Sequence, residues 1–453
     1  MRRLSWILSL FLLSSSLYAQ QAEGEADQQE ATSEKKQEEV KTGWNFGAVP
    51  AIAYDADVGF RYGALANIYH YGDGSRYPKY DHSLYVEWSR TTKGSGNNTF
   101  NWDTDRLIPG VRSFFELSLK TEQALDFYGF NGYQSLFEQG FDETPADAFS
   151  DRLFYRHSRK LLRIKGDFQG EIIGQKFRWL TGIAYYGNTI DEVDVDKLNE
   201  GKTEDLLSYN NLYTKYVDWG IIKPDQENGG GHTLLKAGLV YDTRDNEPNP
   251  YTGIWTEMQF HYAPSFLSNT DYTYGRLIFT HRQYFTIVPE WVNFAARVSY
   301  QGNLFGEMPF YMMPYLFNTA PQLTTDGVGG SKTVRGVMRN RIVGEGIAFG
   351  NVELRGKVLK TKLLKQNFYI ALSAFVDAGM VTQKYALPEN LLTDFPEAAT
   401  HVDPTAKEKP HIGYGGGVHL VLNQNFIVAV DYGFAANKQD GDSGLYIGLN
   451  FLY

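Results

Sequence analysis

Apolar and polar residues alternate with a period of two along most of this chain. The last ten residues, 444–453, read GLYIGLNFLY. Five of them share one parity: Leu445, Ile447, Leu449, Phe451 and Tyr453. A run of about ten residues with this period has the length of a tilted strand that crosses a bilayer. The alternative interpretation is an edge strand of a soluble sandwich.

The same alternation continues from residue 43 to the end of the chain, interrupted only by turn residues. It predicts about sixteen strands, an even number that suits a closed antiparallel barrel. Their approximate cores are 45–54, 58–71, 82–91, 99–106, 111–121, 152–169, 176–187, 232–242, 252–263, 272–285, 291–302, 343–356, 367–379, 412–422, 425–435 and 444–453.

The predicted connections differ in length on the two sides of the barrel. Four of them are long, and all four fall on the side that we expect to face the cell exterior: 122–151, 188–231, 303–342 and 380–411. Connections on the other side, such as 172–175, 289–290 and 423–424, are short. Short periplasmic turns and long outer loops are typical of outer-membrane barrels.

Parity also predicts which face of a strand meets lipid. Around Trp291 and Asn425 the outward set is Val292, Phe294, Ala296, Val298, Tyr300, Phe426, Val428, Val430, Tyr432 and Phe434. The inward set is Asn293, Arg297, Ser299, Gln301 and Asp431. A charge on the lipid face at mid-depth costs about 2–4 kcal/mol, so these parities are strongly constrained. Roughly sixteen strands leave an interior that side chains alone do not fill, which predicts a plug or a pore.

The N-terminal residues predict an export signal. Arg2 and Arg3 precede an apolar segment, 6–13, and Ala19 is a suitable residue for cleavage. We therefore expect a signal peptide at 1–19. Residues 20–43 hold almost nothing apolar and predict a disordered acidic periplasmic tether. The barrel then occupies 44–453.

Composition supports an envelope protein. The chain has 453 residues, a net charge of −10 and 15% aromatic residues, with a mean hydropathy of −0.38. After the signal, no apolar run is long enough for a spanning helix. Abundant aromatic residues suit the girdles of a large barrel in the outer membrane of a Gram-negative bacterium. The acidic balance gives no support to nucleic-acid binding, and the absence of cysteine excludes a lipoprotein, a disulfide and a thiolate metal site.

Patterns that would indicate an enzyme are missing from the sequence. It has no HExxH motif and no GxSxG motif, and its nine histidines are scattered. The segment 327–333 contains glycines and a lysine but lacks the spacing of a phosphate loop. We therefore expect no catalytic activity, no cofactor and no metal. Asp242 and Asp245 bracket Arg244 near a short turn, which favours a salt-bridged turn over an acid pair.

Four segments together resemble one known family. Val334-Arg335-Gly336-Val337 is similar to the VRG(Y/F) tip of the inward-folded sixth outer loop in the BamA-type bacterial surface antigen superfamily. The segment 349–355, FGNVELR, resembles the strand-12 motif of that family. The strand-13 motif is matched by Phe375, Asp377 and Gly379, and the hairpin of strands 8 and 9 by Asp242, Arg244, Asp245 and Gly253.

This resemblance implies a sixteen-stranded transmembrane barrel with its sixth outer loop folded inward. The superfamily contains outer-membrane assembly insertases and two-partner secretion translocators. Two departures stand out. Val337 occupies a position where the family more often has an aromatic residue, and the periplasmic POTRA repeats are replaced by the tether, so the chain resembles a POTRA-less branch.

The chemistry of the loop tip can be stated from the residues. Parity turns Glu353 and Asp377 into the lumen on neighbouring strands. Arg335 cannot lose its charge, and its planar guanidinium suits carboxylates. We expect a clamp in which Arg335 lies between Glu353 and Asp377, with Gly336 permitting a close backbone approach. The alternative is that Arg335 is a solvated loop cation and the two acids are ordinary lumen residues.

In the family, the first and last strands meet in a weak seam. Pro50 lies in the first strand, and Gly444 and Gly448 lie in the last strand, which closes at Tyr453. Proline removes a ladder donor and glycine weakens pairing, so the seam is expected to be under-bonded and able to template a client strand. The alternative is a bulge without function.

Three classes of function follow. The first is a barrel that assembles, inserts or translocates outer-membrane proteins. The others are a structural or accessory barrel of an envelope complex and a porin-like channel. Expected partners are outer-membrane lipid and lipopolysaccharide, client barrel proteins, and periplasmic or lipoprotein subunits. The sequence does not determine the oligomeric state. In the loop 122–151, Tyr128, Phe130, Tyr133 and Phe137 predict a packed cap, with sugar binding as the alternative.

Overall fold

The computed structural model describes residues 40–51, 53–55, 59–77, 79–92, 94–142, 151–174, 176–204, 206–246, 249–318, 325–363, 366–422, 426–449 and 451. The barrel lies in the compact unit Lys41–Tyr453. The predicted signal peptide and most of the predicted tether fall outside the described residues, so those boundaries stay predictions.

Seventeen strands in the described part of the chain form one antiparallel sheet. Two of them, β1 and β2, pair with β3 in one continuous register, from Trp44↔His70 to Asp55↔Gly59. They therefore form a single interrupted strand, and the sheet has the sixteen strand positions that the sequence predicts.

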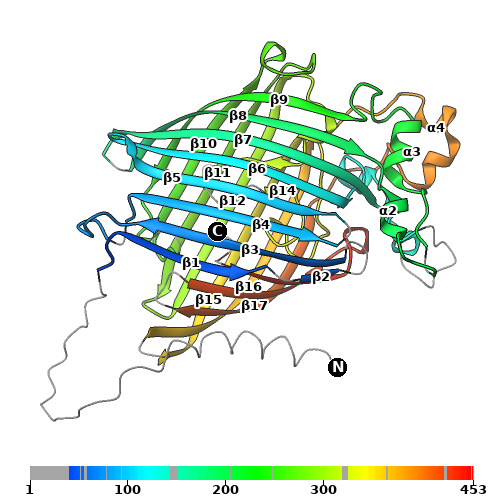
Figure 1. Ribbon diagram of the computed structural model, residues 1–453. Coiled ribbons are helices and arrows are strands. Elements are labelled where there is room, and N and C mark those ends of the chain that lie inside the picture. The colour runs from blue at the N-terminus through cyan, green and yellow to red at the C-terminus, as the bar shows by residue number, and fades with distance from the viewer. Residues whose placement is uncertain are drawn as a thin grey trace, which may run out of the picture. The chain divides into compact units, whose positions relative to one another are not determined.

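The strands pair in chain order with antiparallel neighbours, which confirms the predicted all-β barrel wall. Figure 1 shows the sheet curving so that the first strands, in blue, and the last strands, in red, return to the same part of the wall. The strands are β1 Trp44–Pro50, β2 Ala53–Asp55, β3 Gly59–His70, β4 His82–Thr91, β5 Gly96–Ile108, β6 Val111–Asp126, β7 Arg156–Ile173, β8 Phe177–Asp191, β9 Gly229–Asp242, β10 Gly253–Ala263, β11 Tyr274–Val288, β12 Val292–Gly306, β15 Gly346–Leu363, β16 Gln366–Gln383, β17 His411–Leu422, β18 Phe426–Ala435 and β19 Ser443–Leu449.

The two faces of each strand differ in the way that parity predicts. In β12, Asn293 and Ser299 are each 4% exposed inside the barrel, whereas Val298 is 52% exposed on the outer face. Asp431 in β18 is buried, and Tyr432 beside it is exposed. Burial here follows the inward polar and outward apolar alternation of a membrane barrel.

The long connections all leave the same end of the sheet, which we call the long-loop end. In their described parts they carry three α-helices, α2 Val195–Asn199, α3 Leu212–Asp218 and α4 Leu391–Asp394, which gather at that end in Figure 1. The connection between β12 and β15, 307–345, is the sixth along the chain at this end when the short connections are counted as well, and we call it the sixth loop. It also holds a short strand pair, β13 Tyr315–Leu316 and β14 Thr325–Asp326. The alternation of apolar and polar residues did not predict these helices or this strand pair. No helix in the described residues is long and apolar enough to cross a membrane.

An aromatic core fills the long-loop end, and we call it the cap. Phe130, Tyr155, Tyr216 and Phe310, from three different loops or their borders, are each at most 3% exposed. Tyr216 and Phe310 both contact the ring of Phe130. The predicted packing is confirmed, because Tyr128, Phe130 and Phe137 are buried and Tyr133 is half-buried.

The prediction for the end of the chain is wrong at Phe451. In the described residues the last strand runs to Leu449, and Phe451 is not part of a strand. Leu445 and Ile447 are 57% and 71% exposed, but Phe451, which shares their parity, is 8% exposed. It packs in an apolar cluster with Tyr369, Ala371, Val421 and Ile427. The outward position of Leu445 and Ile447 is therefore not continued at Phe451, because its ring is buried inside the barrel. Tyr453 lies outside the described residues.

Candidate functional site

The tip of the sixth loop lies inside the barrel. Its four residues, Val334 to Val337, are all buried. A tight turn precedes the tip, because the Thr333 hydroxyl donates to the carbonyl of Gly329 and accepts from its amide. The amide of Gly330 then donates to the carbonyl of Val337 at 2.7 Å, which closes the tip. Gly336 has a φ of +95°, a conformation that favours glycine.

The side chain of Arg335 is bonded to carboxylates from three strands. Its Nε donates to Oδ2 of Asp377 at 2.8 Å and its second terminal nitrogen to Oδ1 at 3.2 Å, a bidentate pair. The other terminal nitrogen donates to Glu353 at 2.8 Å and to Asp431 at 3.1 Å. The guanidinium also lies 3.4 Å above the centre of the Phe375 ring.

This charge cluster is almost completely buried. Arg335 is 1% exposed, Glu353 2% and Asp377 0%. Desolvated charges are stable only when they are paired with good geometry, and removing one partner leaves the other charges buried with fewer partners. The backbone amide of Arg335 donates to Asp377 as well, at 3.1 Å. The structure therefore places Arg335 between the two carboxylates that parity turns inward, and adds a third, Asp431.

The tip rests on glycines of β17 and β18. A Cβ on Gly413 would lie 1.8 Å from the carbonyl oxygen of Arg335, and one on Gly433 would lie 2.8 Å from the amide of Gly336. A Cβ on Gly336 would lie 2.4 Å from the carbonyl of Phe434. The amide of Gly336 donates to the hydroxyl of Tyr446 in β19 at 2.9 Å. The tip is thus seated against the last strands of the wall.

Apolar contacts fix the two flanks of the tip. Val334 and Val337 belong to one buried cluster, completed by Leu316, Val328, Ile342, Ile347, Phe349 and Val381. Gly379 faces this cluster, and a Cβ there would lie about 3 Å from three of its side chains. The three residues of the strand-13 motif lie in β16 and have distinct positions. Phe375 lies under the guanidinium of Arg335, Asp377 pairs with it, and Gly379 leaves room for the loop.

The hairpin that resembles strands 8 and 9 of the family joins β9 and β10 in this structure. Its residues form a separate cluster at the end of the barrel opposite the long-loop end. Asp242 and Arg244 form a bidentate ion pair at 2.9 Å. Asp245 instead accepts backbone amides of its own turn, from Tyr251 at 2.9 Å and Thr252 at 3.2 Å. A Cβ on Gly253 would lie 2.3 Å from the carbonyl of Thr243. The structure places these residues in a turn, as expected, with Asp245 organising its backbone.

The predicted seam residues lie at three places. Pro50 ends β1, where the first strand is interrupted. Gly444 and Gly448 both pair with β18, opposite Gly433 and Ala429. These pairs lie on the side of β19 away from β1, and the strength of the seam stays a prediction.

Sequence reasoning missed several residues around the tip. Asp431 is a lone acid on an otherwise apolar strand, and that isolation could have identified it as a partner of Arg335. The run GYGGG at 413–417 is a second signal, because glycines in a strand mark a close backbone approach. Nothing in the alternation indicates that Tyr446 would bond to the tip.

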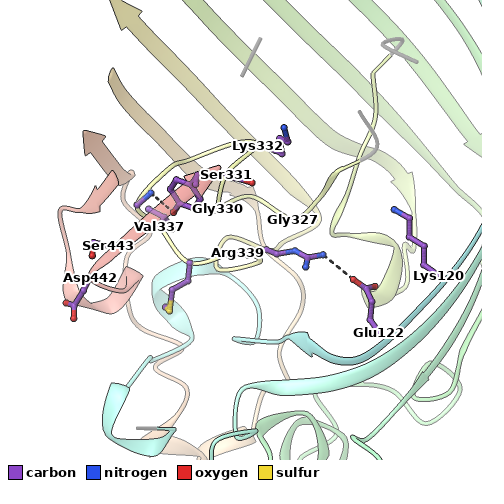
Figure 2. Close-up of a pocket in the computed structure, with 14 residues that line it drawn as sticks. Lys120, Glu122, Gly327, Gly330, Ser331, Lys332, Val337, Arg339, Asp442 and Ser443 are labelled. Carbon is purple, nitrogen blue, oxygen red and sulfur yellow. Dashed lines mark hydrogen bonds and ion pairs between the residues drawn. The ribbon is translucent and has the colours of Figure 1, made fainter. Parts of the chain in front are cut away.

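A cavity of about 450 Å³ remains beside the tip. It lies between the sixth loop, the wall strand β6 and the start of β19, and Figure 2 shows Lys120 and Glu122 of β6 across from Lys332 and Arg339 of the loop. Arg339 pairs with Glu122 at 3.3 Å across this space. The described residues hold no cluster of acids and histidines suited to a metal ion. The tip therefore narrows the lumen without filling it.

Comparison with known proteins identifies related barrels. Residues 181–451 match the Omp85 superfamily domain. No curated protein sequence matches the chain. Among solved structures, the BamA of Haemophilus ducreyi lacking POTRA domains 1–3 has a TM-score of 0.51 and 15% identity, covering 90% of this chain and 69% of that one. CdiB from Escherichia coli has a TM-score of 0.55 and 10% identity, covering 90% of this chain and 62% of its own length. At these identities the two likenesses show the fold.

Proposed function

Because this chain belongs to the Omp85 superfamily of non-enzymatic transport and assembly barrels in the Gram-negative outer membrane, we propose that it inserts or translocates proteins at that membrane. In this proposal the sixth loop plugs the barrel from the cell exterior. Client strands enter at the seam between β1 and β19. Clients are unfolded barrel proteins, and periplasmic or lipoprotein subunits are further candidate partners.

The clamp around Arg335 carries the proposal. Burying an arginine and three carboxylates has a large desolvation cost, which only well-formed ion pairs offset. A loop tip held in this way therefore has one defined position in the lumen, as a plug requires. The tip is seated on β17, β18 and β19, the strands that lead to the proposed seam. Attachment of the plug to the last strands supports a barrel in which plug and seam are mechanically connected.

Properties of the first and last strands support opening at the seam. The first strand is interrupted after Pro50, and β19 pairs with β18 over seven of the described residues. Phe46 in β1 is 84% exposed and Ile447 in β19 is 71% exposed, so both strands present apolar side chains outward. Unpaired backbone N–H and C=O groups at the edge of a sheet readily accept another strand.

A folding assay in liposomes tests this function. A small outer-membrane barrel, unfolded in urea, is diluted into liposomes with or without the reconstituted protein, and its folding is followed by the heat-dependent shift of its gel band. We expect faster folding with the wild-type protein. A cysteine pair placed across β1 and β19 should abolish the gain when oxidised and restore it when reduced, and the chain's own lack of cysteine keeps the result unambiguous. Equal folding rates in all samples would exclude the insertion function.

The cavity beside the tip supports a second candidate function. Lys120, Lys332 and Arg339 face Glu122 and Asp442 across about 450 Å³, a polar space next to the plug. A polar space of this kind suits a narrow channel gated by the sixth loop. Conductance measurements separate this candidate from the first.

A further inference from the structure

The last described residue of the chain is bound inside the barrel. Phe451 is 8% exposed, and its ring centre lies 4.0 Å from the guanidinium carbon of Arg355. The ring of His419 packs nearly perpendicular to it, at 4.9 Å and 78°. Phe451 therefore occupies a site formed by a cation, an imidazole and the apolar floor of Tyr369, Ala371, Val421 and Ile427.

Both polar neighbours of Phe451 lead to Arg335. The Nε of Arg355 donates to Oε1 of Glu353 at 2.6 Å, and the other oxygen of Glu353 accepts from Arg335 at 2.8 Å. On the other side, His419 is bonded to Oδ1 of Asp431 at 3.0 Å, and Oδ2 of Asp431 accepts from Arg335 at 3.1 Å. The contacts close a ring through six side chains: Arg335, Glu353, Arg355, Phe451, His419 and Asp431.

We propose that this ring is a binding site for the aromatic residue near the chain's end, and that its occupation by Phe451 is coupled to insertion of the sixth-loop tip. The occupant is the chain's own Phe451. Each carboxylate of the ring uses one oxygen for Arg335 and the other for a neighbour of Phe451. When Arg335 withdraws, Glu353 and Asp431 are no longer held in place by its guanidinium. Arg355 and His419, which are bonded to these two carboxylates, then lose their fixed positions against the aromatic ring of Phe451.

Coupling of this kind works equally in both directions. Loss of the aromatic ring removes the face on which Arg355 stacks, and Arg355 then competes with Arg335 for Glu353. A guanidinium over an aromatic face is an attractive contact that strengthens when it is desolvated, and Arg355 is 5% exposed. The site itself does not depend on the proposed function. If the barrel does open at β19, the site sets how firmly the end of that strand is held.

Burial of an apolar side chain alone would also hold Phe451 in place. Leucine in its position would keep that burial and lose the stacking on Arg355, so Phe451→Leu separates the two explanations. Phe285→Leu is the matched control, because Phe285 in β11 is an outward-facing aromatic residue, 44% exposed, on a different strand from the ring.

Amide hydrogen exchange of the full chain in liposomes tests the coupling. Two peptides are followed, one covering the loop tip at 330–342 and one covering the chain end at 443–453. We expect Phe451→Leu and Arg355→Gln each to raise exchange at least fivefold in both peptides, Arg335→Ala to raise it at the chain end as well as at the tip, and Phe285→Leu to change neither. Arg355→Lys keeps the charge and should show a smaller effect than Arg355→Gln.

The opposite result is equally clear. If Phe451→Leu alters exchange only at the chain end, or Arg335→Ala alters it only at the tip, the two are independent and the proposal is wrong. The gel shift of the folded barrel shows that each variant has folded before exchange begins. No client is present in this experiment, so failure of the folding assay and failure of the coupling are distinguishable.

Discussion

At the scale of single residues, Arg335 holds the tip of the sixth loop inside the lumen. Its guanidinium satisfies Asp377 with two parallel bonds and shares one nitrogen between Glu353 and Asp431. Lysine could not reproduce this arrangement, because an ammonium is a point charge without a planar fork. The identity of this residue, and not only its charge, is therefore what keeps the tip inside.

Replacing Arg335 with alanine should destabilise the barrel. Three buried carboxylates would lose their bonds to Arg335, and breaking a buried pair costs about 3–5 kcal/mol. We expect Arg335→Ala to lower the free energy of unfolding by about that amount and Arg335→Lys to lower it by less, both measured by urea titration of the gel-shifted band. Arg339→Ala is the control, because Arg339 is 45% exposed and such pairs contribute about 0–1 kcal/mol. Equal stabilities of Arg335→Ala and wild type would contradict the clamp.

Gly413 provides a steric test of the same seat. A Cβ at this position would lie 1.8 Å from the carbonyl oxygen of Arg335, so Gly413→Ala should displace the tip while leaving every charge in place. We expect the sixth loop to become sensitive to added protease in intact liposomes. Gly356→Ala in β15 serves as the control, because nothing lies within 4 Å of its added Cβ. Unchanged protection in Gly413→Ala would show that the tip is not seated on this strand.

Parity could predict part of this site and not the rest. Glu353 and Asp377 follow from alternation on adjacent strands, because a strand places every second side chain in the lumen. Asp431 and Tyr446 depend on where the loop crosses the lumen, which is a contact between residues about a hundred positions apart. Alternation along one strand holds no information about such a contact.

At the scale of elements, strands were predictable because each one obeys a local rule. The alternation from His82 to Thr91 gives both ends of β4 correctly. By contrast, β15 and β16 each run to 18 residues and extend beyond their predicted ends. The helix α3 has no strand alternation to mark it, and its residues are placed by packing of Tyr213 and Tyr216 in the cap. Loop structure of this kind is determined by tertiary contacts.

Cap stability should depend on pH through His401. Burial, and to a smaller extent the charge of Lys215, lowers the pKa of His401 to about 4. Since its unfolded pKa is about 6.5, the unfolded cap binds more protons between these values. The stabilisation is complete above about pH 6.5 and is lost as pH falls towards 4, by about 1.4 kcal/mol per pH unit.

Urea titrations at pH 7.5 and pH 5.0, followed by tryptophan fluorescence, measure this dependence. Trp219 stacks near the His401 ring at 5.8 Å and reports on the same part of the cap. We expect a lower midpoint at pH 5.0 in the wild type and a much smaller difference in His401→Phe, which keeps the aromatic packing without the titrating group. If the urea midpoint changed by the same amount between pH 7.5 and pH 5.0 in the wild type and in His401→Phe, groups other than His401 would be responsible for the pH dependence.

At the scale of the whole molecule, two structures obstruct the barrel in series. The cap closes the long-loop end with aromatic side chains, and the tip of the sixth loop narrows the lumen below it. Arg341 joins them, because it follows the tip in sequence and donates to the carbonyls of Gly132 and Ser135 in the cap at 3.0 and 2.8 Å. A barrel obstructed twice is an inefficient open pore, and a conducting state requires movement of the sixth loop.

Conductance across planar bilayers tests this arrangement directly. The wild type should show a small, flickering conductance, because ions must pass the cap and the cavity beside the tip. Arg335→Ala releases the tip and should raise the conductance several-fold. A second change, Arg341→Ala, removes the ties to Gly132 and Ser135 and should raise it further when combined with the first. Arg339→Ala, which breaks a half-exposed pair with Glu122 and leaves the bonds of Arg335 in place, should leave the conductance close to that of the wild type. A large and steady conductance that is equal in wild type and Arg335→Ala would mean that ions pass without displacing the loop, and the channel function would then replace the insertion function.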